Sequence, residues 1–113
     1  MKGENKHQAD LVSYIKGSLP MIKVVYIKNE CPPSVQAKTK AIRMGLLPGT
    51  PDLMLLAPNG NLMFLELKDK GKKPRKNQVE VMEMLNSYGF KSEWSDEFGL
   101  SKIKVLEWVN EWM

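Results

Sequence analysis

Two different spacings of hydrophobic residues mark the start of the chain. A stripe at helical spacing predicts a helix over residues 5–19, which Pro20 stops. The stripe consists of Gln8, Leu11, Val12, Ile15 and Leu19. β-branched and aromatic residues follow at 23–28 (KVVYIK), and they predict a strand. We therefore expect the fold to begin with a helix and a strand.

A segment that breaks regular structure, NECPPS, separates this strand from a second expected helix. The hydroxyl of Ser34 can cap that helix and Gly45 can end it, so we expect it over residues 35–44. The helix carries three cations, Lys38, Lys40 and Arg43.

Two neighbouring apolar segments predict the centre of a sheet. Residues 52–57 (DLMLLA) and 62–68 (LMFLELK) are separated by a hairpin signal, PNGN, at 58–61. Both segments are apolar at nearly every position and not only at alternate ones. This pattern predicts strands that are buried on both faces.

The last third of the chain predicts two more helices and one more strand. Pro74 can lie near the first turn of a helix that runs to residue 88 and ends at Gly89, and residues 90–95 indicate a short strand. The core face of the C-terminal helix is expected to consist of Ile103, Leu106, Val109 and Met113. The resulting order, α-β-α-β-β-α-β-α, predicts an α/β fold in which helices flank a mixed central sheet, formed by residues 1–113 as a single domain.

Composition excludes several classes of protein. With 113 residues, of which 42% are hydrophobic, the chain can fill a core, so intrinsic disorder does not fit. Its one cysteine, Cys31, cannot form an internal disulfide, which favours a reducing compartment. No apolar run approaches the roughly 20 residues of a membrane span, and the polar N-terminus does not resemble a signal peptide. We therefore expect a cytoplasmic protein without a membrane partner.

The net charge of +4 is distributed unevenly. Residues 68–76 (KDKGKKPRK) contain six Lys or Arg against one Asp, whereas the chain from residue 77 onward has three Lys against seven Asp or Glu. A polyanion would be attracted to one side of such a protein. A solvated surface loop is the alternative interpretation of this basic run.

Three charged residues stand where a buried sheet is expected. Glu66 and Lys68 are two apart in one strand and so project from the same face, and Asp52 opens the preceding strand. Two carboxylates at a sheet edge can bind a hard cation such as Mg²⁺, and a neighbouring lysine can orient or deprotonate the water that attacks a phosphodiester. Taken alone, Glu66 and Lys68 favour an ordinary ion pair at a strand end, with Asp52 capping a turn; only the combined pattern favours the metal site.

The hairpin connection decides whether these side chains can meet. A two-residue turn at Asn59-Gly60 would pair Asp52 with Leu67 and place Asp52 on the opposite face from Glu66. A connection with an odd number of residues, or a bulge, restores the shared face. We therefore predict a three-residue or bulged connection at 58–61, or a break in pairing at Asp52, with the two carboxylates close enough to share one cation.

The combined pattern resembles the PD-(D/E)XK nuclease signature. More narrowly, GLLPGTPDLMLL followed by NGNLMFLELKDKGKKPRKNQ is similar to the virus-type replication-repair nuclease (VRR-NUC) domain. The resemblance rests on Gly49, Pro51, Asp52, Leu53, Glu66, Lys68, Gly71 and Gln78, and it spans residues 4–108. It implies a restriction-endonuclease-like fold of the standalone phage or bacterial type.

The resemblance also implies roles for individual residues. Asp52, Glu66 and the backbone carbonyl of Leu67 would bind Mg²⁺ or Mn²⁺, and Lys68 would be the catalytic lysine. Gln78 would contact the scissile phosphate or the hydration shell of the metal. Glu4 matches the acidic residue on the first helix of the family, although a helix-capping or solvated role fits it equally well.

The function that the resemblance implies is metal-dependent cleavage of DNA in replication, recombination or repair. It further implies a homodimer that acts on branched DNA, like a Holliday junction resolvase, in a bacterial or phage-infected cell. The cations expected to bind nucleic acid are Lys70, Lys72, Lys73, Arg75 and Lys76 in the basic run, and Lys38, Lys40 and Arg43 in the second helix. The alternatives are a nucleic-acid-binding module that does not cleave, and a protein-interaction scaffold, which would leave Glu66 and Lys68 unexplained.

Other residue types offer weaker signals. His7, the lone histidine, is expected to be a surface residue, and Cys31 has no partner at metal-binding spacing. Trp94, Trp108 and Trp112 could stack on unpaired bases, but core or subunit packing is the commoner role for tryptophans one helical turn apart.

Overall fold

The computed structural model describes residues 3–27 and 32–113, apart from the side chain of residue 4. Its helices and strands are α1 (Gly3–Ser18), β1 (Lys23–Tyr26), α2 (Val35–Arg43), β2 (Leu53–Leu56), the short 3-10 helix η1 (Pro58–Gly60), β3 (Leu62–Leu67), α3 (Lys76–Ser87), β4 (Lys91–Ser95) and α4 (Phe98–Trp112). Apart from η1, this is the predicted order, with boundaries that differ by a few residues. As predicted, the Ser34 side chain caps α2 by accepting a hydrogen bond from the backbone N–H of Ala37.

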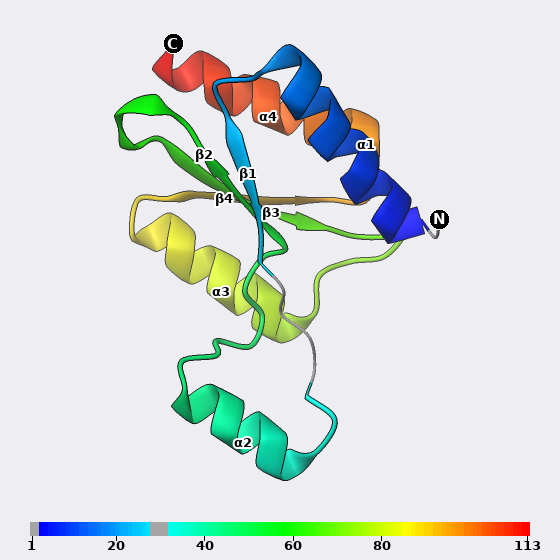
Figure 1. Cartoon of the computed structure of the whole chain (residues 1–113), viewed down its shortest axis with the longest axis vertical. Coiled ribbons are helices and arrows are strands. Elements are labelled where there is room, and N and C mark those ends of the chain that lie inside the picture. Colours follow the sequence, from blue (N-terminus) through cyan, green and yellow to red (C-terminus); the bar gives the residue numbers. More distant parts are fainter. Residues whose placement is uncertain (1–2, 28–31) are drawn as a thin grey trace.

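The four described strands form one mixed sheet in the order β1-β2-β3-β4. β1 and β2 pair antiparallel, as do β2 and β3, whereas β3 and β4 pair parallel. The prediction that the two apolar segments form the centre of the sheet is therefore confirmed. Figure 1 shows α1 and α4 side by side, α3 apart from them across the sheet, and α2 projecting from one end of the body.

One face of the sheet forms the hydrophobic core with α1 and α4. The alternate strand residues Leu53, Leu55, Met63, Leu65 and Leu67 are fully buried on this face, together with Leu11, Ile15 and Val105 of the two helices. Because side chains alternate across a strand, the residues between them belong to the other face. Asp52 and Glu66 are among these, so the candidate site lies on the side of the sheet that faces α3.

The register of β2 and β3 confirms the predicted odd-numbered connection. Leu53 pairs with Leu65 and Leu56 with Leu62, and the backbone N–H of Ala57 donates to the carbonyl of Asn61 at 2.9 Å. The three residues of η1 form the connection, and Asn59 adopts a left-handed conformation with φ 64°. Continued by one residue, this register places Asp52 opposite Glu66, and the two side chains share a face.

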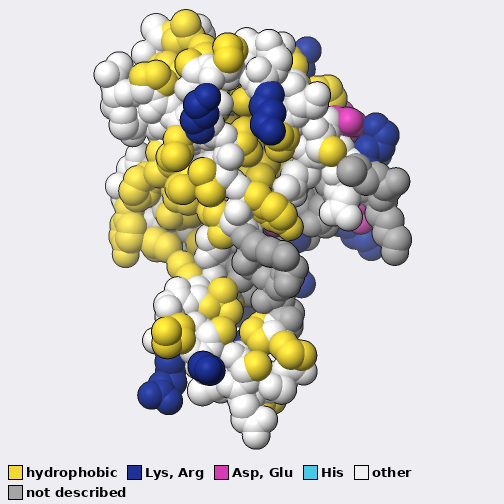
Figure 2. Space-filling model, in the orientation of Figure 1, with side chains coloured by type: hydrophobic (Ala, Val, Ile, Leu, Met, Phe, Trp, Pro, Cys, Tyr) yellow, Lys and Arg dark blue, Asp and Glu magenta, His cyan; other side chains and the backbone are white. Residues whose placement is uncertain are grey.

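The second face of the sheet is less covered than the apolar pattern predicts. α3 packs mainly against β4, so β1 and β2 lack a helix on this side. Leu56 and Val25 are therefore exposed, and Figure 2 shows hydrophobic side chains spread over the body as well as on α2. The prediction of burial on both faces is therefore wrong for β2.

The buried face of α4 also differs from the prediction. Val109 is buried as expected, but Ile103, Leu106 and Met113 are exposed, and Ser101, Val105 and Trp108 face the core instead. The helix has apolar residues on several sides, so its periodicity does not define one face. Trp108 has the largest apolar surface to bury, and its burial confirms the packing role expected for it; Trp112 packs against it edge to face.

Candidate active site

Asp52 lies where the backbone pairing of the central strands ends. Its backbone carbonyl accepts a hydrogen bond from the N–H of Ile27 at 2.7 Å, which extends the pairing between β1 and β2 by one residue. Its carboxylate Oδ2 accepts a hydrogen bond from the backbone N–H of Leu67 at 2.9 Å. The carboxylate is thus held against the end of β3, next to Glu66 and Leu67.

Glu66 is a buried carboxylate in contact with two polar side chains. It is 2% exposed, and its Oε1 lies 3.9 Å from Nζ of Lys68 and 3.5 Å from Nε2 of Gln78. The Lys68 side chain is itself only 13% exposed. Burial of a charge is costly unless an opposite charge or a hydrogen-bond donor accompanies it, and here both are present.

Gln78 reaches the site from the first turn of α3. Its Oε1 accepts a hydrogen bond from the backbone N–H of Arg75 at 2.7 Å, and its amide nitrogen points to Glu66. The first hydrogen bond satisfies one of the backbone donors that a helix N-terminus leaves free, and it also fixes the orientation of the amide. The structure therefore brings Gln78 together with Glu66 and Lys68.

The loop before β2 passes very close to the same helix end. Gly49 has φ 90°, and a Cβ atom at this position would lie 2.6 Å from the backbone oxygen of Asn77. Only glycine fits this conformation and this approach. The loop that ends in Pro51 and Asp52 is thereby packed against the N-terminus of α3, which links the position of Asp52 to that of Gln78.

His7 is not the surface residue that the sequence predicts. It is 6% exposed, its Nε2 lies 2.7 Å from Oγ of Ser101, and its Nδ1 lies 3.4 Å from the backbone oxygen of Lys68. A ring with Nδ1 protonated donates to Lys68 and accepts from Ser101, so one tautomer satisfies both contacts. Its spacing of four residues before Leu11 and eight before Ile15 was the signal that could have indicated burial.

The expected DNA-binding cations are solvent-exposed. This holds for Lys70, Lys72, Lys73, Arg75 and Lys76 after the site, and for Lys38, Lys40 and Arg43 on α2. Two contacts hold the basic loop to the β4–α4 connection: Asp96 accepts from the backbone N–H of Gly71 at 3.0 Å, and Nζ of Lys70 lies 3.6 Å from Glu97. α2 has no buried residue, so its cations project from a helix that makes little contact with the body.

The donor set at the site consists of oxygen atoms. Within residues 3–27 and 32–113 no group of three His, Cys, Asp or Glu side chains gathers at one point, so two carboxylates are the side-chain donors that the structure describes here. Carboxylate and carbonyl oxygens are ligands that Mg²⁺ and Mn²⁺ accept. Asp52, Glu66 and the Leu67 carbonyl therefore suit a hard divalent cation. The side chain of Glu4, and Cys31, lie outside the described residues.

Solved structures resemble this architecture, although the sequence itself matches no known family. No family model and no curated protein matches the sequence. A solved structure described as "VRR_NUC domain" superposes with a TM-score of 0.68 at 20% identity, covering 95% of this chain and 97% of the other. The chain therefore has the VRR-NUC fold. A second structure, described as "VRR_NUC domain protein", superposes on this fold with a TM-score of 0.73 at 18% identity, covering 97% and 90% of the two chains.

The VRR-NUC fold was the fold expected from the motifs around Asp52 and Glu66, and this expectation is confirmed. A membrane-spanning helix is absent from the described residues, since each helix there is too short or too polar. What the sequence did not indicate is the support behind the charged residues: His7 and Ser101 on one side of β3, and the contact of Gly49 with α3 on the other.

Proposed function

We propose that this chain is a divalent-metal-dependent nuclease that hydrolyses phosphodiester bonds of DNA. The observation that carries the proposal is the register of β2 and β3, which aligns Asp52 with Glu66 on the sheet face that also bears Lys68. A scaffold would gain stability from apolar residues at these buried positions. The VRR-NUC fold of the chain supports the same conclusion.

Asp52, Glu66 and the Leu67 carbonyl would hold Mg²⁺ or Mn²⁺. When bound, the cation supplies Lewis-acid polarisation of a phosphate oxygen. Lys68 would orient the attacking water and hold or release a proton at Nζ, 3.9 Å from Glu66 Oε1. Gln78 would donate its amide N–H to the scissile phosphate, because its carbonyl oxygen is already engaged with Arg75.

The substrate would be anchored through its phosphates by the exposed cations of the basic loop and α2. The basic loop directly follows β3, and α2 precedes β2 through the loop of residues 44–52. We further propose that the substrate is branched DNA, in a bacterial or phage-infected cell, as the VRR-NUC resemblance implies.

We also propose that the protein acts as a homodimer. Its accessible surface of 7365 Å² exceeds the roughly 6300 Å² expected for a compact monomer of this mass. The excess includes two unpartnered apolar surfaces, one on α2 and its C-terminal cap (Val35, Ile42, Met44) and one on the sheet (Val25, Leu56). A two-fold dimer could bury these surfaces twice and would present two sites to strands of opposite polarity.

The test is incubation of the purified protein with labelled linear, flapped and four-way DNA in Mg²⁺, Mn²⁺ or EDTA. The expected result is cleavage in the presence of metal, strongest on a branched substrate, and none in EDTA. Binding without cleavage under every metal condition would favour the non-catalytic binding module instead. Cleavage that EDTA leaves unchanged would contradict the assignment of Asp52 and Glu66 to a metal.

A further inference from the structure

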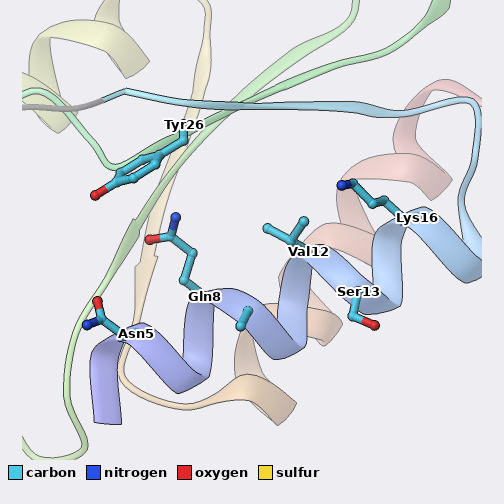
Figure 3. Close-up of a pocket in the computed structure, with 7 residues that line it drawn as sticks. Asn5, Gln8, Val12, Ser13, Lys16 and Tyr26 are labelled. Atoms are coloured by element: carbon cyan, nitrogen blue, oxygen red, sulfur yellow. The ribbon is translucent and has the colours of Figure 1, made fainter. Parts of the chain in front are cut away.

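A groove of about 530 Å³ lies between α1 and β1, on the opposite sheet face from Glu66. Its lining includes Asn5, Gln8, Val12, Ser13 and Lys16 of α1, and Tyr26 of β1. Figure 3 shows the Tyr26 ring extending from β1 over Gln8, with Asn5 beyond it and Lys16 at the other end. The groove is thus formed by one face of a helix and the edge strand beside it.

The chemistry of the groove favours a flat, polar and uncharged or anionic ligand. Asn5 and Gln8 each offer an amide that can both donate and accept hydrogen bonds. Tyr26 is 59% exposed, so most of its ring surface is open to a stacking partner. Among the lining residues that the structure describes, Lys16 is the one with a charged side chain.

The groove begins next to the candidate active site. Tyr26 immediately precedes Ile27, whose backbone N–H donates to the carbonyl of Asp52. Gln8 immediately follows His7, which contacts the backbone oxygen of Lys68. A DNA strand cleaved at Asp52 and Glu66 would therefore pass within reach of the groove as it rounds the end of the sheet.

We infer that the groove binds an unpaired nucleobase of the DNA substrate. The base stacks on Tyr26, its edge hydrogen-bonds to Gln8 and Asn5, and Lys16, at the other end of the groove, contacts a backbone phosphate of the same strand. Amide side chains can read a base edge with two hydrogen bonds, and stacking on an aromatic ring is open to any base that has left the duplex. In a fully paired duplex both faces of each base are covered. The groove would therefore select DNA with an unpaired nucleotide near the cleaved bond.

This inference rests on the proposed nuclease function, and a binding experiment can separate the two. The full chain is titrated in EDTA, which prevents metal-dependent cleavage, with two duplexes of equal length. One duplex is fully paired, and the other carries a single unpaired 2-aminopurine at a flap. Affinity is measured by anisotropy, and stacking by the fluorescence of the 2-aminopurine.

The expected result is tighter binding of the flapped duplex, with quenched fluorescence. Tyr26→Ala should weaken binding of the flapped duplex about 5- to 150-fold and abolish the quenching, while affinity for the paired duplex stays unchanged. Tyr26→Phe should retain both properties because it keeps the ring. Gln8→Ala should weaken binding of the flap with partial quenching left. The control is Tyr88→Ala, an exposed tyrosine at the far end of α3.

Three results would overturn the inference. If Tyr26→Ala binds and quenches the flapped duplex as the wild type does, or weakens both duplexes equally, the groove does not hold a base, and the proposed nuclease function is unaffected. If the wild type binds neither duplex, the proposed function fails as well.

Discussion

Glu66, which carries a buried charge, is the most informative single residue of this chain. It is almost fully enclosed between central strands and α3, where an apolar residue would be the stabilising choice. The sequence could predict that Glu66 and Lys68 share a face, because strand alternation fixes which residues of one strand point the same way. The shared face of Asp52 also required the odd-numbered connection between the two strands, which the register confirms. The helical spacing of His7 could have indicated its burial, but the sequence could not predict its partners, because Ser101 and Lys68 come from distant segments.

The first prediction for a single residue concerns Lys68. Lys68→Ala should lower the rate of DNA cleavage about 10²- to 10⁴-fold, while the affinity for DNA changes little. Lys68 is assigned to the attacking water and is largely buried, so it contributes little to phosphate anchoring. Single-turnover cleavage and anisotropy measure the two quantities, with Lys102→Ala on α4 as the control. Cleavage at the wild-type rate would show that the site has been assigned wrongly.

A second residue-scale prediction concerns His7. His7→Ala removes both ring contacts and leaves the buried hydroxyl of Ser101 without this partner, which should destabilise the fold by about 1–3 kcal/mol. Chemical denaturation measures this loss. Because the ring also contacts the backbone of Lys68, we expect kcat to fall in the folded variant with KM nearly unchanged. An equally stable variant would mean that the His7 to Ser101 contact contributes nothing to folding.

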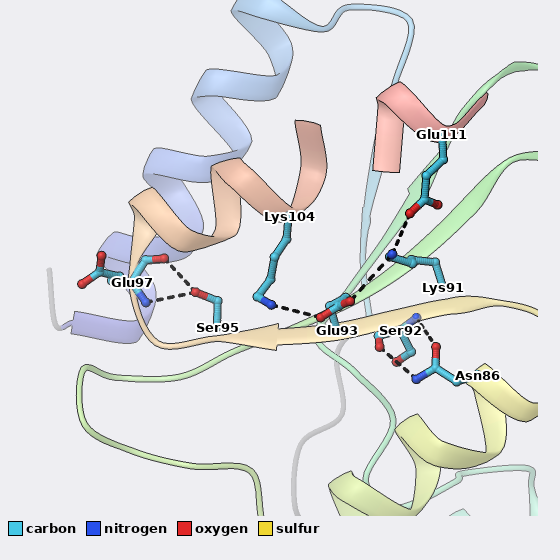
Figure 4. A network of polar contacts seen from close by, with 8 residues as sticks. All are labelled: Asn86, Lys91, Ser92, Glu93, Ser95, Glu97, Lys104 and Glu111. Atoms are coloured by element: carbon cyan, nitrogen blue, oxygen red, sulfur yellow. Dashed lines mark hydrogen bonds and ion pairs between the residues drawn. The ribbon is translucent and has the colours of Figure 1, made fainter. Parts of the chain in front are cut away.

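At the scale of elements, polar contacts fix the edge of the sheet opposite to the exposed β1. Figure 4 shows β4 linked to α4, where Lys91 lies 2.8 Å from Glu111 and Lys104 lies 3.0 Å from Glu93. The hydrogen bond with Glu111 raises the pKa of Lys91, and neighbouring carboxylates add to the effect while burial opposes it. Asn86 of α3 bonds the backbone of Ser92 from the other side. β4 is thereby held between two helices, which keeps α3 and its Gln78 at a fixed position on the sheet.

The contact between the loop before β2 and α3 predicts a strong effect at Gly49. Gly49→Ala would need a left-handed alanine and a Cβ inside the backbone of Asn77, so we expect destabilisation of about 2 kcal/mol or more. Gly17→Ala is the matched control, because its Cβ would meet nothing within 4 Å and alanine favours a helix. Thermal denaturation of both variants tests the contact. Equal melting temperatures would contradict it.

The basic loop leads to the other prediction at this scale. Replacing Lys70, Lys72, Lys73, Arg75 and Lys76 with Gln should weaken binding to all DNA sequences alike. It should also reduce the slope of log affinity against log salt by about one for each lost phosphate contact, because each contact releases a counterion. Titrations at several salt concentrations measure the slope, with Lys102→Gln as the control. A slope equal to that of the wild type would assign the loop to solvated surface.

At the scale of the whole molecule, the least predictable feature is which apolar residues the chain leaves uncovered. The pattern of β2 indicated burial on both faces, but the structure covers this strand with helices on one face only. Likewise Val35 and Ile42, seven residues apart, lie on one face of a helix as core residues would, yet α2 buries no residue in the single chain. The spacing of apolar residues indicates that a surface needs a partner. It does not indicate whether that partner belongs to the same chain. The radius of gyration, 14.5 Å against about 13 Å for a compact domain of this length, reflects the projecting helix.

If a second copy is the partner of these surfaces, charges on α2 should separate the two chains. We expect the wild type to behave as a dimer of the 12.9 kDa chain in light scattering after size exclusion. Ile42→Glu combined with Met44→Glu should give a folded monomer, because buried unpaired carboxylates at the interface are costly and the same positions are exposed in the single chain. Ile103→Glu on α4 is the control, since Ile103 is as exposed as Ile42 but lies outside both apolar surfaces. A monomeric wild type, or a dimer that survives both substitutions on α2, would contradict this assignment.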